Sequence, residues 1–124
     1  MIFLDTHVVV WLYAGMLDKL SKTAIEHIEQ NTLMASQVVR LELQYLHEIG
    51  RLTVTADTVL TELRKSIGMK VSEDLTGSVF DNAIESDWTR DVFDRLIVAE
   101  AKTHKTTLLS KDRKILDHYT GAVW

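Results

Sequence analysis

The sequence contains no cysteine and no proline, and only five of its 124 residues are glycine. The absence of cysteine excludes disulfides and thiolate metal sites, and is typical of a protein from a reducing compartment. No apolar run approaches the ~20 residues that a membrane-spanning helix needs. The first residues are apolar, but they lack the basic segment of a signal peptide and include Asp5. We therefore expect a cytoplasmic protein that does not associate with membranes.

Hydrophobic residues make up 46% of the chain, enough for a core at this length without disulfide bonds. There is no repeat or linker, so we expect a single domain over residues 1–124. The net charge of −4 argues mildly against a nucleic-acid partner. Residues 90–114, however, carry seven of the fourteen basic residues and only four of the eighteen acids. This segment is compatible with a phosphate-binding surface and also with an ordinary solvated one.

Short apolar runs alternate with amphipathic segments along the chain. We expect strands at residues 2–4, 32–35, 69–72, 106–109 and 122–124, and helices at 6–14, 21–30, 37–49, 55–67, 75–86, 91–104 and 112–119. Continuous apolar strands that alternate with helices indicate an α/β protein with a parallel sheet covered on both faces.

Two acids follow predicted strands. Asp5 comes directly after residues 2–4, and Asp112 follows residues 106–109 after a short step. In open parallel sheets, ligands bind beyond the carboxyl ends of the strands. Each acid also precedes a predicted helix, so the alternative for both is a structural role as a helix N-cap.

Two further acids project from the apolar side of a predicted helix. Glu42 lies at the centre of the apolar stripe, between Val38 and Leu46, and Asp94 projects on the same side as Val98. A carboxylate that faces a core is costly unless a cation or hydrogen-bond donors meet it. The alternatives are a buried salt bridge for Glu42 and, for Asp94, an acid that complements the helix dipole.

The four candidate ligands are all carboxylates, and no cysteine or paired histidines accompany them. Such oxygen ligands favour Mg²⁺ or Mn²⁺ over zinc. Without a cation the cluster would repel itself, and some of the carboxyl pKa values should rise. A bound metal ion would relieve this repulsion and could activate water for attack on phosphorus.

Four segments resemble motifs of one family, in the same order along the chain. Residues 4–8, with Trp11 after them, resemble the opening of PIN domains of the VapC toxin type. Residues 36–43 resemble the family's acid-bearing helix, residues 90–96 its "RDPFDR" helix start, and residues 108–112 its fourth-strand motif. The stretch from about 51 to 86 is generic.

The resemblance implies a three-layer α/β/α fold with a five-stranded parallel sheet. It also implies Mg²⁺- or Mn²⁺-dependent cleavage of RNA by the toxin of a toxin–antitoxin pair, with an antitoxin protein as partner and a homodimer as the assembly. By position, Asp5 and Asp94 would bind metal directly, while Glu42 and Asp112 would hold ligand waters or a second ion. Ser110 matches a polar position near the metal.

Several basic and aromatic residues lie near the four acids in the sequence. Lys111, Arg113 and Arg95 are candidate contacts to flanking phosphates, with solvated side chains as the alternative. We interpret His7 as structural, and Trp11 as part of the core or of a dimer face rather than a platform for bases.

Departures from the family pattern are small. Val92 stands where proline is usual, and Glu100 replaces a common glutamine; its helical phase turns it away from Asp94. Neither touches the four acids.

Three other functions remain as alternatives. A haloacid-dehalogenase-like phosphatase needs a second aspartate two positions after Asp5, where this chain has His7. A receiver-like phosphoacceptor module needs paired acids after the first strand and an acceptor aspartate after the third, and neither is present. A PIN fold that only binds RNA or protein is disfavoured by the complete set of four acids.

Overall fold

A five-stranded parallel sheet forms the centre of the protein in a computed structural model that describes all residues, 1–124. Its strands lie in the order β3-β2-β1-β4-β5. They are β1 (Ile2–Leu4), β2 (Leu33–Ala35), β3 (Lys70–Val71), β4 (Leu108–Leu109) and β5 (Ala122–Val123). The prediction of a five-stranded parallel sheet is confirmed.

Seven α-helices connect the strands. They are α1 (Thr6–Ala14), α2 (Lys22–Gln30), α3 (Gln37–Glu48), α4 (Ala56–Ile67), α5 (Gly77–Glu85), α6 (Val92–Thr103) and α7 (Arg113–His118). Every predicted element is present, and its ends fall within two residues of the prediction. The sequence pattern did not predict the short 3-10 helix η1 (Leu17–Lys19) between α1 and α2.

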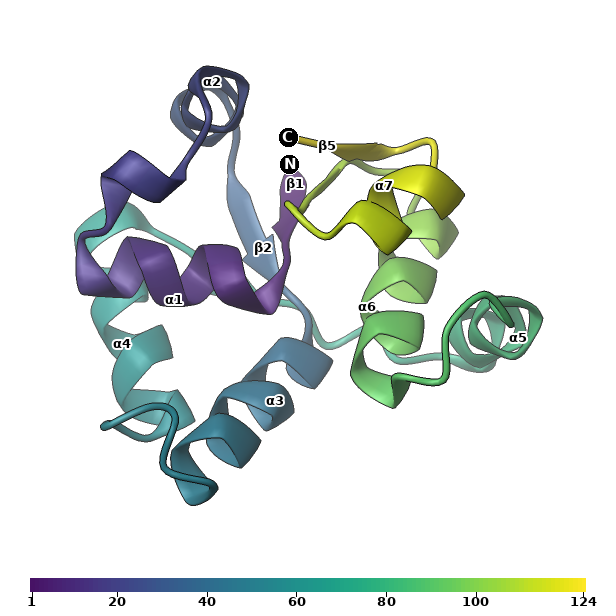
Figure 1. Ribbon diagram of the computed structural model, residues 1–124, viewed down its shortest axis with the longest axis horizontal. Helices are drawn as coiled ribbons and strands as arrows, with labels where there is room; N and C mark the ends of the chain where they lie inside the picture. Colours follow the sequence, from purple (N-terminus) through teal and green to yellow (C-terminus); the bar gives the residue numbers. More distant parts are fainter.

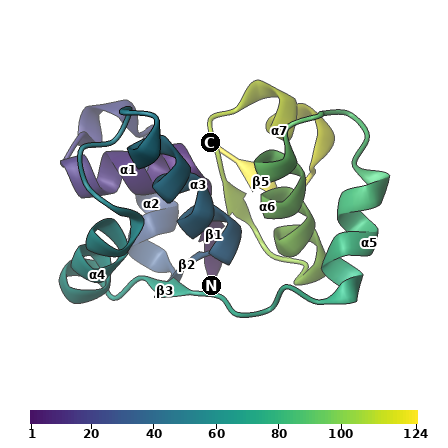
Figure 2. The same ribbon diagram turned by 90° about the horizontal axis from the view of Figure 1, so that it is seen from below.

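The helices form two layers because the chain crosses the sheet in two directions. From β1 to β3 it moves toward one edge, and from β3 through β4 to β5 it moves toward the other. Right-handed crossovers then place α1 to α4 on one face and α5 to α7 on the opposite face. Figure 2 shows this division on either side of the strands. In Figure 1, α3 lies between α1 and α6, and it contacts both helices.

The core forms where the two helical layers meet the sheet. All three residues of β1 are buried because this strand lies at the centre, and its Phe3 pairs with Met34 on one side and Leu108 on the other. Val8 and Val9 of α1, both fully buried, cover it on one face. None of the helices is long and apolar enough to cross a membrane.

Side-chain caps fix where several helices begin, and these caps position the site. Ser36 accepts a hydrogen bond from the Val38 N–H at the start of α3, and Asp91 accepts one from the Asp94 N–H at the start of α6. Capping side chains satisfy backbone N–H groups that have no partner inside the helix. The start of each helix that carries a candidate acid is therefore fixed locally.

Candidate active site

An open pocket of about 560 Å³ lies at the carboxyl edge of the sheet. It brings together the four acids that the sequence singled out, Asp5, Glu42, Asp94 and Asp112. They come from the end of β1, from α3, from the first turn of α6 and from the residue before α7. Acids more than one hundred positions apart in the chain thus face one space, as the strand order requires.

Asp5 is the most rigidly held of the four acids. It is only 3% exposed, and one carboxylate oxygen accepts a hydrogen bond from the Thr6 N–H (2.8 Å). Its other oxygen accepts one from the Ser110 hydroxyl (2.6 Å), which links β1 to the end of β4. The His7 Nδ1 atom lies 3.5 Å from the same oxygen. Asp5 therefore serves as the N-cap of α1 and also presents its carboxylate to the pocket.

Glu42 is held by a hydroxyl from the neighbouring helix. The Thr6 Oγ1 atom on α1 donates a hydrogen bond to its carboxylate on α3. Burial raises the pKa of Glu42, the Thr6 hydrogen bond opposes the rise, and the charges of Asp5 and Asp91 add to it. No arginine or lysine pairs with Glu42, so the alternative of a buried salt bridge is wrong.

Asp94 lies in the first turn of α6, three residues after its cap Asp91. Burial raises the pKa of Asp94 to about 7, with further contributions from the negative charges of Asp5, Asp91, Asp112 and Glu42. No hydrogen bond to its carboxylate offsets these effects. Like-charge repulsion of this kind indicates a place where a positive ion is favoured.

Asp112 caps α7, the structural role that the sequence offered for it, and it also lines the pocket. One of its oxygens accepts hydrogen bonds from the Lys114 N–H (2.8 Å) and the Ile115 N–H (3.2 Å), so it caps α7. Its own N–H donates to the Ser110 hydroxyl (3.1 Å), which also binds Asp5. Ser110 thus orients two of the four acids, although it is completely buried and does not line the pocket.

The three basic side chains expected to contact flanking phosphates do not line the pocket. Arg95 donates hydrogen bonds to the carbonyls of Ala83 and Ile84 at the end of α5 and lies outside the pocket. Lys111 and Arg113 are exposed beside Asp112 but do not line the pocket either. Arg51, just beyond α3, lines it. No sequence pattern predicted Arg51 as a pocket residue, because a loop residue has no periodicity that shows its direction.

The donor chemistry of the pocket fits a hard divalent cation. Its potential ligands are carboxylate oxygens, and Thr6 links two of them, because its backbone N–H donates to Asp5 and its hydroxyl to Glu42. No three of the acidic or imidazole side chains lie close enough together to form a ready-made ligand set. Hydrogen bonds to backbone and hydroxyl groups hold three of these acids. The residues fit Mg²⁺ or Mn²⁺ better than zinc.

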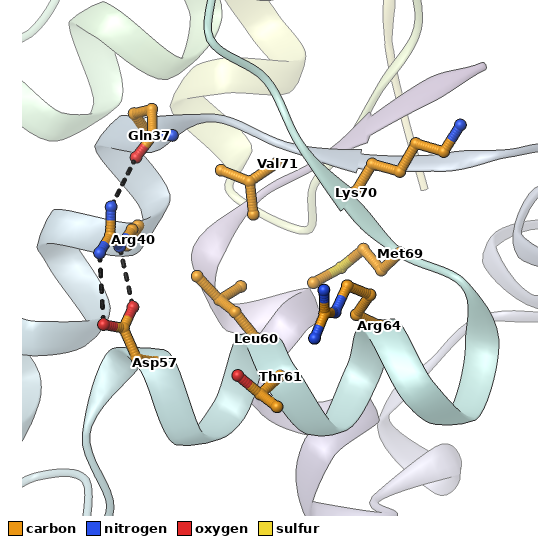
Figure 3. Close-up of a pocket in the computed structure, with 9 residues that line it drawn as sticks. All are labelled: Gln37, Arg40, Asp57, Leu60, Thr61, Arg64, Met69, Lys70 and Val71. Carbon is orange, nitrogen blue, oxygen red and sulfur yellow. Dashed lines mark hydrogen bonds and ion pairs between the residues drawn. The ribbon is translucent and has the colours of Figure 1, made fainter.

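A second hollow, between α3, α4 and β3, offers no comparable chemistry. Figure 3 shows that Arg40 reaches from α3 across to Asp57 on α4, and the ion pair closes at 2.9 Å. This pairing raises the pKa of Arg40 and lowers that of Asp57. Arg64 and Lys70 also line this hollow, and Asp57 is its only acid and is already paired. It therefore has no group of carboxylates for a cation, and the acidic pocket is the candidate active site.

The parallel α/β fold, with its acidic pocket at the carboxyl edge of the sheet, defines the class of this protein. The chain belongs to the PIN domain family, whose family model matches residues 2–121. It is 32% identical over 121 residues to ribonuclease VapC22 of Mycobacterium tuberculosis, and the alignment covers 94% of this chain and 91% of the relative.

Two solved structures share the fold. One is a toxin–antitoxin complex from Klebsiella pneumoniae, with a TM-score of 0.68 and 14% identity, covering 100% of this chain and 97% of the other. The second is VapBC2 from Rickettsia felis bound to a DNA fragment from its promoter, with a TM-score of 0.71 and 19% identity, covering 99% and 96%. The expected family and the three-layer fold are therefore confirmed.

Proposed function

We propose that this protein is a divalent-metal-dependent endoribonuclease that acts in the cytoplasm as the toxin of a toxin–antitoxin pair. The observation that carries the proposal is the convergence of four carboxylates from four separate elements on one pocket. The name of its relative from Mycobacterium tuberculosis, a ribonuclease, supports the type of reaction.

Asp5 and Asp94 hold Mg²⁺ or Mn²⁺ directly in this proposal, and Glu42 and Asp112 hold ligand waters or a second ion. The cation supplies positive charge that draws in a phosphate, and it lowers the pKa of a coordinated water. The hydroxyl of Thr6 fixes Glu42, and that of Ser110 fixes Asp5, so both carboxylates are oriented before the substrate arrives. Asp94 has no such support and is free to adjust.

The proposal also assigns a protein inhibitor to this chain. One solved structure with this fold is a toxin–antitoxin complex, and another is VapBC2 bound to a DNA fragment from its promoter. We expect the product of the neighbouring gene to co-purify with this protein and to inhibit RNA cleavage when added back. Failure of the two to co-purify after co-expression would count against the inhibitor but not against the nuclease.

Asp94→Asn tests the nuclease directly. The substitution keeps the shape of the side chain and removes one negative ligand, so we expect weaker metal binding and turnover lower by roughly 10²-fold or more. The measurement is cleavage of a fluorogenic RNA with Mg²⁺, with Mn²⁺ and with EDTA, alongside calorimetric titration of Mn²⁺. Asp81→Asn, an exposed acid on α5, is the matched control and should retain full activity.

Two results would refute the mechanism: equal cleavage in EDTA, or a fully active Asp94→Asn protein. RNA binding without cleavage across a panel of folded and unfolded RNAs would instead identify a binding module.

A further inference from the structure

A cluster of aromatic rings forms one wall of the acidic pocket. Trp11 on α1 lines the pocket together with His7, and their ring centroids are 4.9 Å apart. Trp124, which follows β5, lies behind them, with its centroid 5.9 Å from that of Trp11 and 6.3 Å from that of His7. Residues 7, 11 and 124 are all partly exposed. Trp11 also packs against the core, as the sequence suggested, but it has an open side.

The orientation of this wall is fixed by the same contacts that hold the acids. His7 Nε2 accepts a hydrogen bond from the Lys111 N–H (2.9 Å), and His7 Nδ1 lies 3.5 Å from Asp5. The imidazole therefore bridges the end of β1 and the segment after β4. Trp11 rests against this ring, so its position relative to Asp5 is set by the fold.

Two lysines from different elements lie over the indole ring of Trp11. Lys19 in η1 and Lys111 after β4 each place their Nζ atom 5.9 Å from its ring centroid. Both lysines are exposed. Their positive charge lies beside a pocket whose other ionisable side chains are mostly acidic.

This combination matches the requirements of single-stranded RNA. The face of an aromatic ring stacks on any base, while lysines neutralise the backbone phosphates on either side. A duplex keeps its bases stacked on one another and has no free base to offer the ring.

We propose that Trp11, supported by Trp124 and His7, is the platform on which an unpaired base next to the cleaved phosphodiester stacks, with Lys19 and Lys111 binding adjacent phosphates. This inference rests on the proposed ribonuclease function and names a subsite of the same pocket.

Replacement of the indole tests the platform. We expect Trp11→Leu to raise the KM for a short single-stranded RNA by roughly 5- to 100-fold, with a smaller change in kcat, and Trp11→Phe to retain most of the affinity. RNA binding should weaken in parallel. It is measured by fluorescence anisotropy in Ca²⁺ buffer, and a gel shows that the RNA stays intact. Trp88→Leu is the control, because that ring stacks on His118 and does not line the pocket.

An abasic substrate tests the platform without any protein variant. RNA that lacks the base next to the cleaved bond should bind the wild-type protein as weakly as intact RNA binds Trp11→Leu. The loss of affinity caused by removing the base should not add to the loss caused by the variant.

A lysine variant tests the proposed phosphate contact. Lys111→Gln should reduce the slope of log affinity against log salt by about 0.7.

The outcomes separate this inference from the function on which it rests. The platform is overturned if Trp11→Leu binds RNA as tightly as the wild type does. It is also overturned if the affinity lost on removing the base adds to the affinity lost in the variant. In both cases RNA cleavage by the wild type stands. A wild type that neither binds nor cuts RNA overturns the proposed function and the platform with it.

Discussion

Glu100 is the residue at which charge and burial conflict most clearly. Its side chain on α6 is fully buried, and neither carboxylate oxygen has a hydrogen-bond partner. Burial raises the pKa of Glu100; the facing hydroxyls of Ser36 and Ser72 and the charge of His104 oppose the rise, and the charge of Asp74 adds to it. Both hydroxyls accept hydrogen bonds from backbone N–H groups, which leaves their protons free to turn toward the carboxyl group.

This environment predicts a pH-dependent cost of folding. The folded protein retains the Glu100 proton more strongly than the unfolded chain, so stability falls as pH rises from the ordinary carboxyl range toward the raised pKa. Glu100→Gln does not titrate. We expect it to match the wild type near pH 4 and to exceed it in unfolding free energy by roughly 1 to 3 kcal/mol at pH 8.

Urea unfolding of both proteins in EDTA at the two pH values measures this difference. Asp94 and Glu42 also have raised pKa values. They contribute equally to the pH dependence of unfolding free energy in both proteins, so their contribution cancels in the difference. Glu62→Gln, an exposed acid on α4, is the control. If Glu100→Gln exceeds the wild type in unfolding free energy by the same amount at pH 4 and pH 8, ionisation of Glu100 is not the cause of the difference.

Helix α4 illustrates how a single backbone conformation ends an element. Gly68 terminates it with φ of 68° and donates its N–H to the carbonyls of Arg64 and Leu63. A Cβ atom at this position would meet nothing within 4 Å, so any cost of a side chain comes from the backbone alone. In the left-handed region that cost is about 1 to 2 kcal/mol for an L residue.

Gly68→Ala should therefore lower the free energy of unfolding by about 1 to 2 kcal/mol without affecting RNA cleavage. Gly77→Ala, in the first turn of α5, is the matched control. It also has open space around the new Cβ and no positive φ, so it should leave stability unchanged or raise it by up to about 1 kcal/mol. Thermal and urea unfolding would measure the change in stability of each variant. Equal changes for Gly68→Ala and Gly77→Ala would contradict the prediction.

On the scale of the whole molecule, an apolar ridge on one side remains exposed. Along α3, Leu41, Tyr45 and Ile49 are spaced four residues apart and are 62%, 46% and 47% exposed. Tyr45 contacts Phe93 (centroids 5.7 Å apart) near the start of α6, where Val92 is 67% exposed. Large exposed apolar patches mark interaction surfaces, and we propose that this ridge forms the homodimer. Trp11, for which the sequence suggested the core or a dimer face, packs against the core and lines the acidic pocket.

Leu41→Lys should convert the dimer into a monomer, because it would place a charge within the proposed interface. Leu17→Lys, on η1, is similarly exposed at 56% but lies outside the ridge and should leave the dimer intact. Light scattering over a range of concentrations distinguishes the species. A wild-type protein that is monomeric at high concentration would refute the dimer, and a dimeric Leu41→Lys protein would refute this surface.

The sequence alone determined the five strands, the seven α-helices, the α/β class and the helical phase of Glu42 and Asp94. Strands and helices produce local periodicities, and caps such as Ser36 and Asp91 act within three residues, so their signal is complete in a short window. For the same reason the inward directions of Glu42 and Asp94 were predictable. That Asp5 and Asp112 lie at the sheet edge followed from the rule for parallel sheets.

Only the tertiary structure decided which side chains meet. The strand order places β4 beside β1, and this pairing brings Ser110 to Asp5. Helical phase correctly turned Glu100 away from the pocket, but it could not show that the opposite side of α6 is also buried. The positions of Arg51 in the pocket and Arg95 against α5 depend on how loops and layers pack, and such contacts leave no periodic trace in the sequence.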